Sequence, residues 1–407
     1  MLLIALVWQI NSCRSAGHST EIVEQYLKLA VSLGERDPDF LDFYVGPESL
    51  ARAARSPLPP LDQIEQNAKH LQAQLPKSDL GAERVAFLNQ QLNAMSQRVR
   101  QLRGATTGFD EESRSYFGVV APPDTDAVQR AKVRSEIAAS IGPDAKAYSA
   151  YEAAFVVSAK QVPAVFEAAL NVCRERTLAR LSMPAGEHVD VTYVVNKPWA
   201  GFSRYLGNAH SQIQVNLGFP QTVDRLLDLA CHEGYPGHHV FNTLREATLV
   251  KQRHQLEWAV QPAFSPQSFV SEAAASYAPQ MVLDDATRVQ IERDVLFPIA
   301  GLSQRDIDRY IRVEKLIAML HTGEPEIARE YLDGRVEFAR ALSRLEEEML
   351  MEHGETMLTY LNEYRSYMLT YTVGLDRVAK YVNAASPENR WQRYTALMTG
   401  PITSLPE

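Results

Sequence analysis

Helical spacing of apolar residues runs through most of this 407-residue chain, and it limits the possible fold more than any other feature. In the first segment the residues at this spacing are Ile22, Val23, Tyr26, Leu27 and Ala30. Residues 61–103 repeat the pattern on both sides of Pro76 and Gly81, which predicts a helical hairpin. Further helices are predicted at 111–116, 125–140, 144–158, 162–181, 223–233, 270–283, 304–321, 325–351 and 354–383. The chain is therefore expected to be mainly α-helical.

One stretch departs from the helical pattern and predicts strands. Residues 189–195 form a short run rich in β-branched side chains, and residues 202–206 and 211–216 have a similar character. Gly207 and Asn208 supply turn residues between the last two segments. We predict one small antiparallel sheet over residues 189–216, beside the helix expected directly after it.

Charge and cysteine content exclude two classes of protein. Lys and Arg number 41 against 50 Asp and Glu, a net charge of −9, whereas a nucleic-acid binder needs a basic surface to neutralise phosphates. The three cysteines, Cys13, Cys173 and Cys231, are odd in number and widely spaced, so they do not indicate a disulfide-built scaffold. We expect an acidic protein that folds around an ordinary apolar core.

The apolar run at residues 1–8 bears on localisation. Eight residues are too few to cross a bilayer, so no transmembrane segment is expected. The run is similar to the apolar part of a signal peptide, and residues 10–13 are a poor lipobox-like match, but no Lys or Arg precedes it. The start of a buried helix is the favoured interpretation. We expect a cytoplasmic protein, with a secreted or lipoprotein-anchored one as the alternative.

The stretch from His232 to His239 contains the residues with the clearest chemistry. It holds three of the ten histidines, and Glu233 directly follows the first of them. Imidazole is a common zinc ligand, and a catalytic zinc usually has three protein ligands and a water. A His-Glu pair on a helix is how zinc peptidases place a ligand beside a general base. The pattern predicts that His232 binds Zn²⁺, or another divalent ion, and that Glu233 is the catalytic base.

The identity of the second ligand depends on the path of the chain after Glu233. Such motifs usually place the second histidine four residues after the first, and here that position is Pro236. On an unbroken helix His238 and His239 would lie about 9 and 10.5 Å along the axis from His232, too far for shared ligation. Glycines near Pro236 make an unbroken helix improbable, and a break would bring the later histidines back. We favour His238 as the second ligand and keep His239 as its rival.

A third ligand is expected from another helix, and Glu272 is the candidate. Ser271 before it is a fair N-cap, and the alanines around it allow close helix packing. Ser276, one turn later, is expected to hydrogen-bond the carboxylate of Glu272. Asp228, one turn before His232, either holds the imidazole in place or is a solvated surface acid. Taken alone, Glu272 equally suits a first-turn acid favoured by the helix dipole, but beside the histidines we favour the ligand role.

The motif His232-Glu233-Gly234-Tyr235-Pro236-Gly237-His238-His239 resembles that of a bacterial family, the domain-of-unknown-function 885 (DUF885) family, usually placed among the zincin-like metallopeptidases. Four further stretches are similar to the family, at residues 37–47, 109–119, 211–216 and 366–374. The resemblance implies a multi-helical, zincin-like zinc hydrolase whose site joins the His-Glu motif to a later glutamate helix. Family members usually carry Gly-Trp after that glutamate. This chain has Ala273-Ala274 there, which suggests an altered pocket wall.

Further residues are candidates for contacts with a substrate. Amide hydrolysis creates an oxyanion, and a donor from a separate helix usually helps the metal to stabilise it. Tyr371 is the candidate, with Tyr367 one turn earlier, although both equally suit core aromatics. Asn216 either helps a strand pair with an extended peptide or ends that strand as a turn residue. Arg365 is a candidate for binding a substrate carboxylate, although a surface role is favoured. Cys231 is expected to be a buried structural thiol, not a nucleophile.

These features together predict an architecture and a function. A helical N-terminal region, 1–183, is expected to cover a cleft, and a catalytic region, 184–407, to complete one compact unit. The catalytic region would contain the sheet at 189–216, the metal helices at 223–283 and the C-terminal helices at 304–383. The expected function is zinc-dependent hydrolysis of a peptide or a small amide substrate. A biosynthetic amide or ester hydrolase and an inactive pseudo-peptidase are the alternatives, and the oligomeric state stays open.

Overall fold

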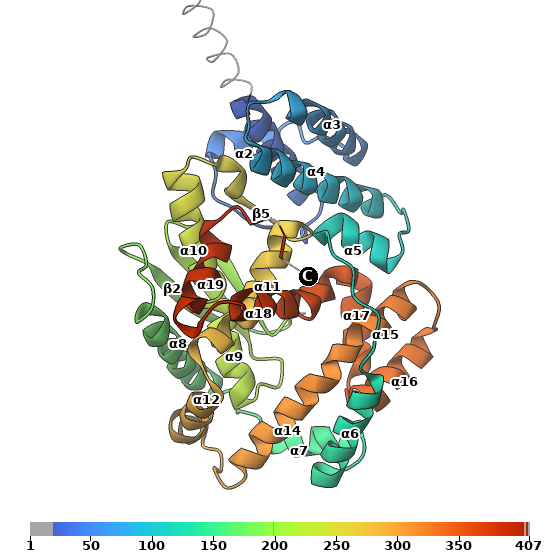
Figure 1. Ribbon diagram of the computed structural model, residues 1–407, viewed down its shortest axis with the longest axis vertical. Coiled ribbons are helices and arrows are strands. Elements are labelled where there is room, and N and C mark those ends of the chain that lie inside the picture. The colour runs from blue at the N-terminus through green and yellow to red at the C-terminus, as the bar shows by residue number, and fades with distance from the viewer. Residues whose placement is uncertain (1–18, 198, 403, 406–407) are drawn as a thin grey trace, which may run out of the picture.

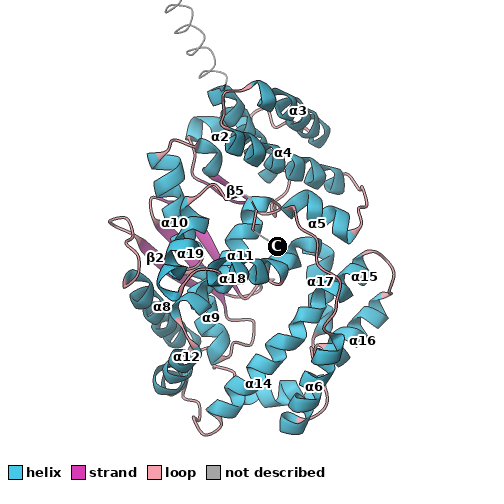
Figure 2. Cartoon of the chain, in the orientation of Figure 1, coloured by secondary structure: helices cyan, strands magenta, loops and turns pink. Residues whose placement is uncertain are grey.

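The structure is a computed structural model that describes residues 19–197, 199–402 and 404–405. Helices make up most of it, as the sequence predicts, and two small sheets lie among them (Figure 1). Figure 2 shows these strands grouped on one side of the molecule, next to α9 and α10. The expectations for residues 1–8 and for Cys13 lie outside the described residues. Within the described part, no helix has the length and apolar character to span a membrane.

The N-terminal region is a succession of helices that starts at residues 19–34. The helices that follow are α2 (Glu48–Arg55), α3 (Leu61–Gln74), α4 (Ala82–Leu102), α5 (Phe109–Phe117), α6 (Ala127–Ile141), α7 (Ala145–Glu152) and α8 (Val162–Leu178). The predicted hairpin is present as α3 and α4, because Ile64, Leu71 and Leu92 are all fully buried and face the same core.

The three predicted strands are present, but their sheet is mixed and not antiparallel. They are β2 (His188–Val194), β3 (Gly201–Gly207) and β4 (His210–Asn216), in the order β2-β4-β3. The two-residue turn makes β3 and β4 an antiparallel hairpin, whereas β4 runs parallel to β2. The prediction was wrong because the longer connection after β2 allows β3 to lie one strand away from it. As a result β3, and not β4, is an edge strand.

A second, antiparallel sheet was not predicted, because its strands are too short to show a period. It pairs β1 (Leu41–Tyr44) with β5 (Val260–Pro262). The two strands come from the N-terminal and the catalytic regions, and one buried apolar cluster also includes side chains from both. The pairing therefore ties the N-terminal segment to the region that carries the candidate ligands.

The helices of the catalytic region are α9 (Val223–Glu233), α10 (His238–Arg245), α11 (Pro266–Val282), α12 (Asp285–Ile291), α13 (Phe297–Ala300), α14 (Ile307–Leu320), α15 (Glu324–Leu332), α16 (Phe338–Glu348), α17 (Gly354–Tyr364), α18 (Val373–Asn383) and α19 (Arg390–Thr399). Two helices that the sequence predicts as continuous are broken. Gly334, at φ +69°, lies between α15 and α16, and Arg365, at φ +50°, ends α17. Neither backbone conformation continues a right-handed helix.

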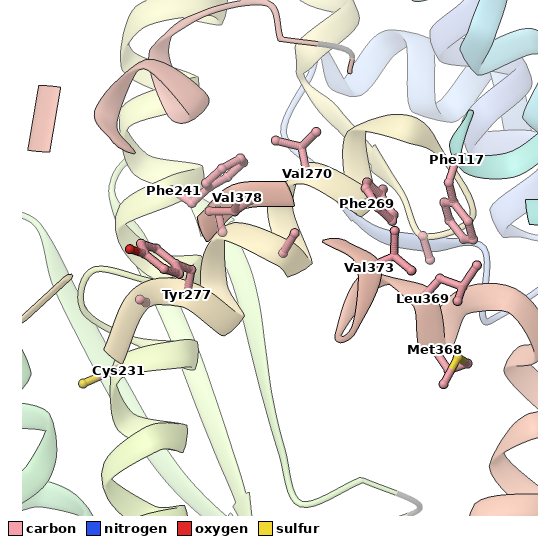
Figure 3. Close-up of a cluster of buried hydrophobic side chains, with 14 of the residues drawn as sticks. Phe117, Cys231, Phe241, Phe269, Val270, Tyr277, Met368, Leu369, Val373 and Val378 are labelled. Carbon is pink, nitrogen blue, oxygen red and sulfur yellow. The ribbon is translucent and has the colours of Figure 1, made fainter. Parts of the chain in front are cut away.

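Helix α11 lies in the middle of the core (Figure 3). Its side chains Phe269, Val270 and Tyr277 are buried, and α18 packs along it. The packing is close at Gly374, where an added Cβ would lie 2.9 Å from the Cβ of Ala273. Ala274 is also enclosed, since its carbonyl accepts a hydrogen bond from the Tyr394 hydroxyl at 2.9 Å. The pair Ala273-Ala274 is therefore a helix-packing surface. The expectation that it forms an altered pocket wall was wrong.

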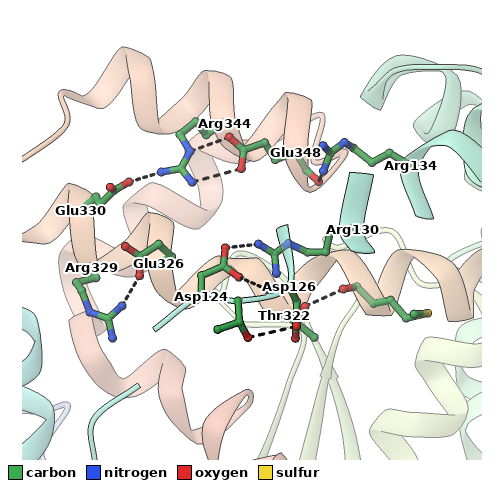
Figure 4. A network of polar contacts seen from close by, with 12 residues as sticks. Asp124, Asp126, Arg130, Arg134, Thr322, Glu326, Arg329, Glu330, Arg344 and Glu348 are labelled. Atoms are coloured by element: carbon green, nitrogen blue, oxygen red, sulfur yellow. Dashed lines mark hydrogen bonds and ion pairs between the residues drawn. The ribbon is translucent and has the colours of Figure 1, made fainter. Parts of the chain in front are cut away.

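Ion pairs join α15 to α16, and a hydrogen bond joins α6 to α16, on another part of the molecule (Figure 4). Arg344 pairs with Glu330 and with Glu348, and the carbonyl of Glu348 accepts a hydrogen bond from Arg134 at 3.3 Å. Contacts of this kind fix how the helices lie against one another, and none of these residues lines the cavity described below.

A group of acids and tyrosines surrounds the start of α9. Thr222 donates a hydrogen bond to Asp224 at 2.6 Å, and Tyr310 donates another to the same carboxylate. Nearby, the Tyr148 hydroxyl donates to Glu314 at 2.9 Å. Burial, together with the charge of Asp224, raises the pKa of Glu314 to about 8. The folded chain therefore keeps a proton on Glu314 at neutral pH.

This proton predicts a pH dependence of stability. Between the ordinary pKa of 4.5 and about 8, folded Glu314 binds a proton that the unfolded chain loses, so stability falls as the pH rises through this window. Glu314→Gln keeps an acceptor for the Tyr148 hydroxyl, and it should remove this loss of stability with rising pH. Relative to wild type, its free energy of unfolding should rise by up to about 1.4 kcal/mol per pH unit. Urea unfolding at pH 5 and pH 9 measures this, with the exposed Glu136→Gln as control; equal pH slopes in both variants would contradict the assignment.

Candidate metal centre

The chain breaks its helix between His232 and His238. Helix α9 ends at Glu233, and α10 begins at His238. In between, the Gly237 amide donates to the Cys231 carbonyl at 3.0 Å, which folds the chain back on the end of α9. A Cβ on Gly237 would lie only 1.8 Å from the His232 carbonyl oxygen, so this turn requires glycine. The predicted break is present, and it places the His238 side chain close to that of His232.

Helix α11 adds a carboxylate to the two imidazoles. His238 Nε2 lies 3.0 Å from one oxygen of Glu272, and His232 Nε2 lies 3.7 Å from the other. The two rings are nearly perpendicular, at 85°, with centroids 4.8 Å apart. One donor atom from each of the three residues falls within 4.8 Å of the others. The three ligands that the sequence predicts are therefore brought together.

The start of α11 differs from its prediction in a way that affects Glu272. The helix begins at Pro266, and its N-cap is Ser265, whose side chain accepts a hydrogen bond from the Ser268 amide at 3.1 Å. Ser271 is therefore inside the helix, where its hydroxyl lies 3.5 Å from His238 Nδ1. Glu272 is past the first turn, where the helix dipole has little effect. The dipole explanation for this glutamate does not apply.

His239 points away from the candidate centre. Its ring is fully buried, with Nε2 3.0 Å from a Glu187 oxygen and Nδ1 2.9 Å from the Ser211 hydroxyl. Both ring nitrogens thus have partners toward the sheet. Successive residues on a helix point about 100° apart, so His238 and His239 cannot face the same centre. The rival assignment of His239 as second ligand was wrong.

Two residues predicted to orient the ligands do not do so. Asp228 forms an ion pair with Arg288 of α12, and the His232 ring donates a hydrogen bond to the backbone carbonyl of Ala275 instead. Among the described residues Ser276 makes no hydrogen bond to Glu272, whereas Tyr371 does. The one-turn spacing places Asp228 and Ser276 on the same helix faces as the ligands. It does not predict which side chains or backbone groups of neighbouring helices compete for these contacts.

The candidate ligands open into a cavity of about 330 Å³. Glu233 lies in its wall beside them, 5% exposed. Tyr367 and Tyr371 also line it, as the sequence predicts, with their ring centroids 6.0 Å apart. The described lining further includes Asp39, Asp42, Trp199, Gly201, Phe202, Ser203, Phe264, Tyr360 and Tyr364, and no Lys or Arg. The cavity is therefore aromatic and acidic.

Burial sets the charges around this centre. It lowers the pKa of His232 to about 4, with His238 adding to the effect, and it raises the pKa of Glu233 to about 7, with Glu272 adding to it. Burial also raises the pKa of Glu272, but His238 outweighs it and brings the value to about 2. In turn Glu272 outweighs the effect of burial on His238 and raises its pKa to about 9. Asp42 in the same cavity also has its pKa raised to about 7, by burial and by Glu272, so Glu233 and Asp42 are two acids here that titrate near neutral pH.

Comparison with protein-family models, curated proteins and solved structures finds no match to the chain. The resemblance of residues 232–239 to the DUF885 family stays a prediction. The functional argument therefore depends on the geometry of the site.

Asn216 and Arg365 lie outside the cavity, and both were wrong as substrate contacts. The Asn216 side chain is buried, and its amide donates to the carbonyls of Lys197 and Trp199 at 2.9 Å. Its alternative, a residue that holds the turn, is confirmed, and it fixes the loop that presents Trp199 to the cavity. Arg365 pairs with Glu112 at 2.5 Å, because the backbone break after α17 turns its side chain toward α5.

Cys231 is neither a free thiol nor a nucleophile. It forms a disulfide with Cys173 of α8, with the two Cα atoms 5.5 Å apart. The pair was not predicted because 58 positions separate the cysteines along the chain, and only the packing of α8 on α9 brings them together. The bond fixes α9 one residue before His232.

The sequence did not predict Tyr360, Tyr364 or Asp42 as cavity residues, although the spacing of the tyrosines indicates two of them. Tyr360, Tyr364, Tyr367 and Tyr371 follow one another at spacings of three and four, which places their side chains on one side of a helical segment. All four line the cavity. Asp42 had no such signal, since its strand is only four residues long.

Proposed function

We propose that the chain is a zinc-dependent hydrolase that cleaves a peptide or a related amide bond. The observation that carries the proposal is the convergence of His232, His238 and Glu272 beside Glu233 in one cavity. Two imidazoles and one carboxylate are a donor set of catalytic zinc, which keeps a further position for water or substrate. We choose zinc over other divalent ions because the three ligands lie beside Glu233, as in zinc peptidases. The resemblance to zincin-like peptidases agrees with this choice.

The side chains around the ligands have the chemistry that such a reaction needs. When bound, zinc lowers the pKa of water and polarises a carbonyl oxygen. Glu233, with a pKa of about 7, takes the proton of the attacking water and later gives it to the leaving amine. The Tyr371 hydroxyl donates a hydrogen bond to the substrate oxygen on which negative charge develops. Desolvation of the hydroxyl in the cavity and the charge of Glu272 keep the pKa of Tyr371 well above its usual range, so the hydroxyl stays a donor.

The role of Tyr371 predicts the effect of removing one oxygen atom. At saturating zinc, Tyr371→Phe should lower kcat about 10²–10³-fold, the usual cost of losing one oxyanion donor, with KM little changed. Zinc affinity should fall by no more than about 10–100-fold, because the hydroxyl also hydrogen-bonds Glu272. Steady-state kinetics together with elemental analysis measure this. Tyr381→Phe, which removes a hydroxyl from α18 outside the cavity, is the matched control. If kcat of Tyr371→Phe were close to that of wild type, the hydroxyl would not be an oxyanion donor and the tyrosine would only pack against its neighbours.

The size of the cavity also suits a second class of substrate. About 330 Å³ is at the lower end for ligand pockets, so a small-molecule amide or ester is the alternative to a peptide. The protein should first be analysed for zinc and then assayed with a library of quenched peptides and with non-peptide amides and esters. Near-stoichiometric zinc with peptide cleavage supports the proposal. Hydrolysis of the small amides or esters alone would favour the alternative.

The pseudo-peptidase alternative loses its main support. It depended on Ala273-Ala274 as a changed pocket wall, and these residues pack against α18 and α19 instead. Glu233 and the three candidate ligands all remain in the cavity. An active enzyme is therefore the better-supported reading of the site.

The disulfide favours an oxidising compartment. Cys173 and Cys231 are buried between α8 and α9, and structural disulfides of this kind persist outside the reducing cytoplasm. We therefore propose the secreted alternative over the cytoplasmic location that the N-terminal residues suggested.

A further inference from the structure

A second group of candidate ligands lies on the three-stranded sheet, outside the cavity. It consists of His188 and Asp190 on β2 and His210 on β4. Alternate residues of a strand share one face, and on β2 His188 and Asp190 are exposed while Val189 between them is partly covered. The sheet itself therefore places these side chains together toward solvent.

The register of the strands aligns the two imidazoles. His188 lies directly opposite His210 in the parallel pairing of β2 and β4, and their rings stack with centroids 3.9 Å apart. An oxygen of Asp190 lies 2.8 Å from His210 Nε2. One donor atom from each of the three residues falls within 4.8 Å of the others, as in the first centre.

A backbone carbonyl orients one of the rings as in known metal sites. His188 Nδ1 lies 3.1 Å from the Gly186 carbonyl oxygen. Because a carbonyl only accepts, Nδ1 carries the proton, and in the neutral ring Nε2 keeps a free lone pair. Metal-binding histidines usually donate their other ring N–H to such a partner, which fixes the tautomer.

We propose that His188, Asp190 and His210 form a second site, for a divalent transition-metal ion such as Zn²⁺, Ni²⁺ or Cu²⁺. Imidazole and carboxylate ligands suit these ions, and solvent completes the coordination at an exposed position. Binding replaces the contact between Asp190 and His210, since both then face the ion. The bound ion would clamp the edge strand β2 to β4. Because solvent reaches this site freely, it should bind its ion more weakly than the buried first centre.

Calorimetric titration of the chelator-stripped, full-length chain with Zn²⁺ tests the proposal. Wild type should bind two ions, and His210→Asn and Asp190→Asn should each bind one. The matched control Gln212→Asn changes a neighbouring position of β4 and should still bind two. His238→Asn should lose the tighter ion and keep the weaker one. Two ions bound by both His210→Asn and Asp190→Asn would overturn the proposal.

This design separates the second site from the proposed function. If the first centre bound no metal, wild type would bind one ion, and only the substitutions at His210 and Asp190 would remove it. Electron paramagnetic resonance of Cu²⁺ in the His238→Asn variant gives an independent readout. The spectrum should show two coupled imidazole nitrogens, and one after His188→Asn. A spectrum unchanged by His188→Asn would exclude this residue as a ligand and overturn the site.

Discussion

Glu233→Gln should lower turnover about 10²–10⁴-fold while zinc stays bound, because that is the usual contribution of general acid–base catalysis. Glu233 lies in the cavity wall next to His232 but is not among the three candidate ligands. The amide is nearly the same size as the carboxylate, so the buried position should tolerate it. It cannot accept a proton at neutral pH, and the attacking water then lacks its base.

Three measurements make this test specific. Elemental analysis should give the same zinc content as wild type, and urea unfolding should give a similar or higher stability, since burial disfavours the charged form of Glu233. Cleavage of the peptide library should fall by the factor stated above. The control Glu175→Gln makes the same change on the exposed face of α8 and should leave all three unchanged. Full activity in Glu233→Gln, with zinc present, would remove Glu233 from the mechanism.

The sequence predicted the parts of the site that depend on short-range chemistry. His232 and Glu233 end a helix whose predicted bounds, 223–233, are those of α9. The glycines and proline after it predict a break, and the steric demand at Gly237 explains why the break brings His238 back. These features are encoded within about ten residues. No knowledge of the rest of the fold was needed.

The errors came from long-range contacts. Asp228 has the right spacing to support His232, yet Arg288, 60 positions later, binds it instead. Arg365 turns toward Glu112, 253 positions earlier, because of a backbone break that no residue pattern announces. The partner of Cys231 and the pairing of β1 with β5 are likewise set by packing between distant segments. Spacing along one helix gives the direction of a side chain but not the partner that competes for it.

Different effects on zinc binding are expected from substituting the adjacent residues His238 and His239. His238→Asn removes a candidate ligand that contacts Glu272 at 3.0 Å. Loss of an outer partner of a metal ligand alone lowers affinity about 10–100-fold, so loss of the ligand itself should lower zinc affinity more than about 100-fold. Activity should disappear with the metal. The substitution should also lower the free energy of unfolding of the metal-free chain at neutral pH, because the pKa values of about 9 for His238 and about 2 for Glu272 describe a mostly buried ion pair that the substitution breaks.

His239→Asn should lower stability but keep the metal. The substitution leaves His232, His238 and Glu272 in place, so zinc content and turnover should stay near wild type. It removes the buried contacts to Glu187 and Ser211, and leaving such groups unpaired costs about 1–3 kcal/mol. Urea unfolding of the metal-free proteins and zinc titration of both variants measure the two effects separately. Zinc loss in His239→Asn with zinc retained in His238→Asn would reverse the ligand assignment. Because the two residues are neighbours on α10, a general disturbance of this helix would lower zinc affinity in both variants, and only distinct side-chain roles remove zinc from one variant and leave it in the other.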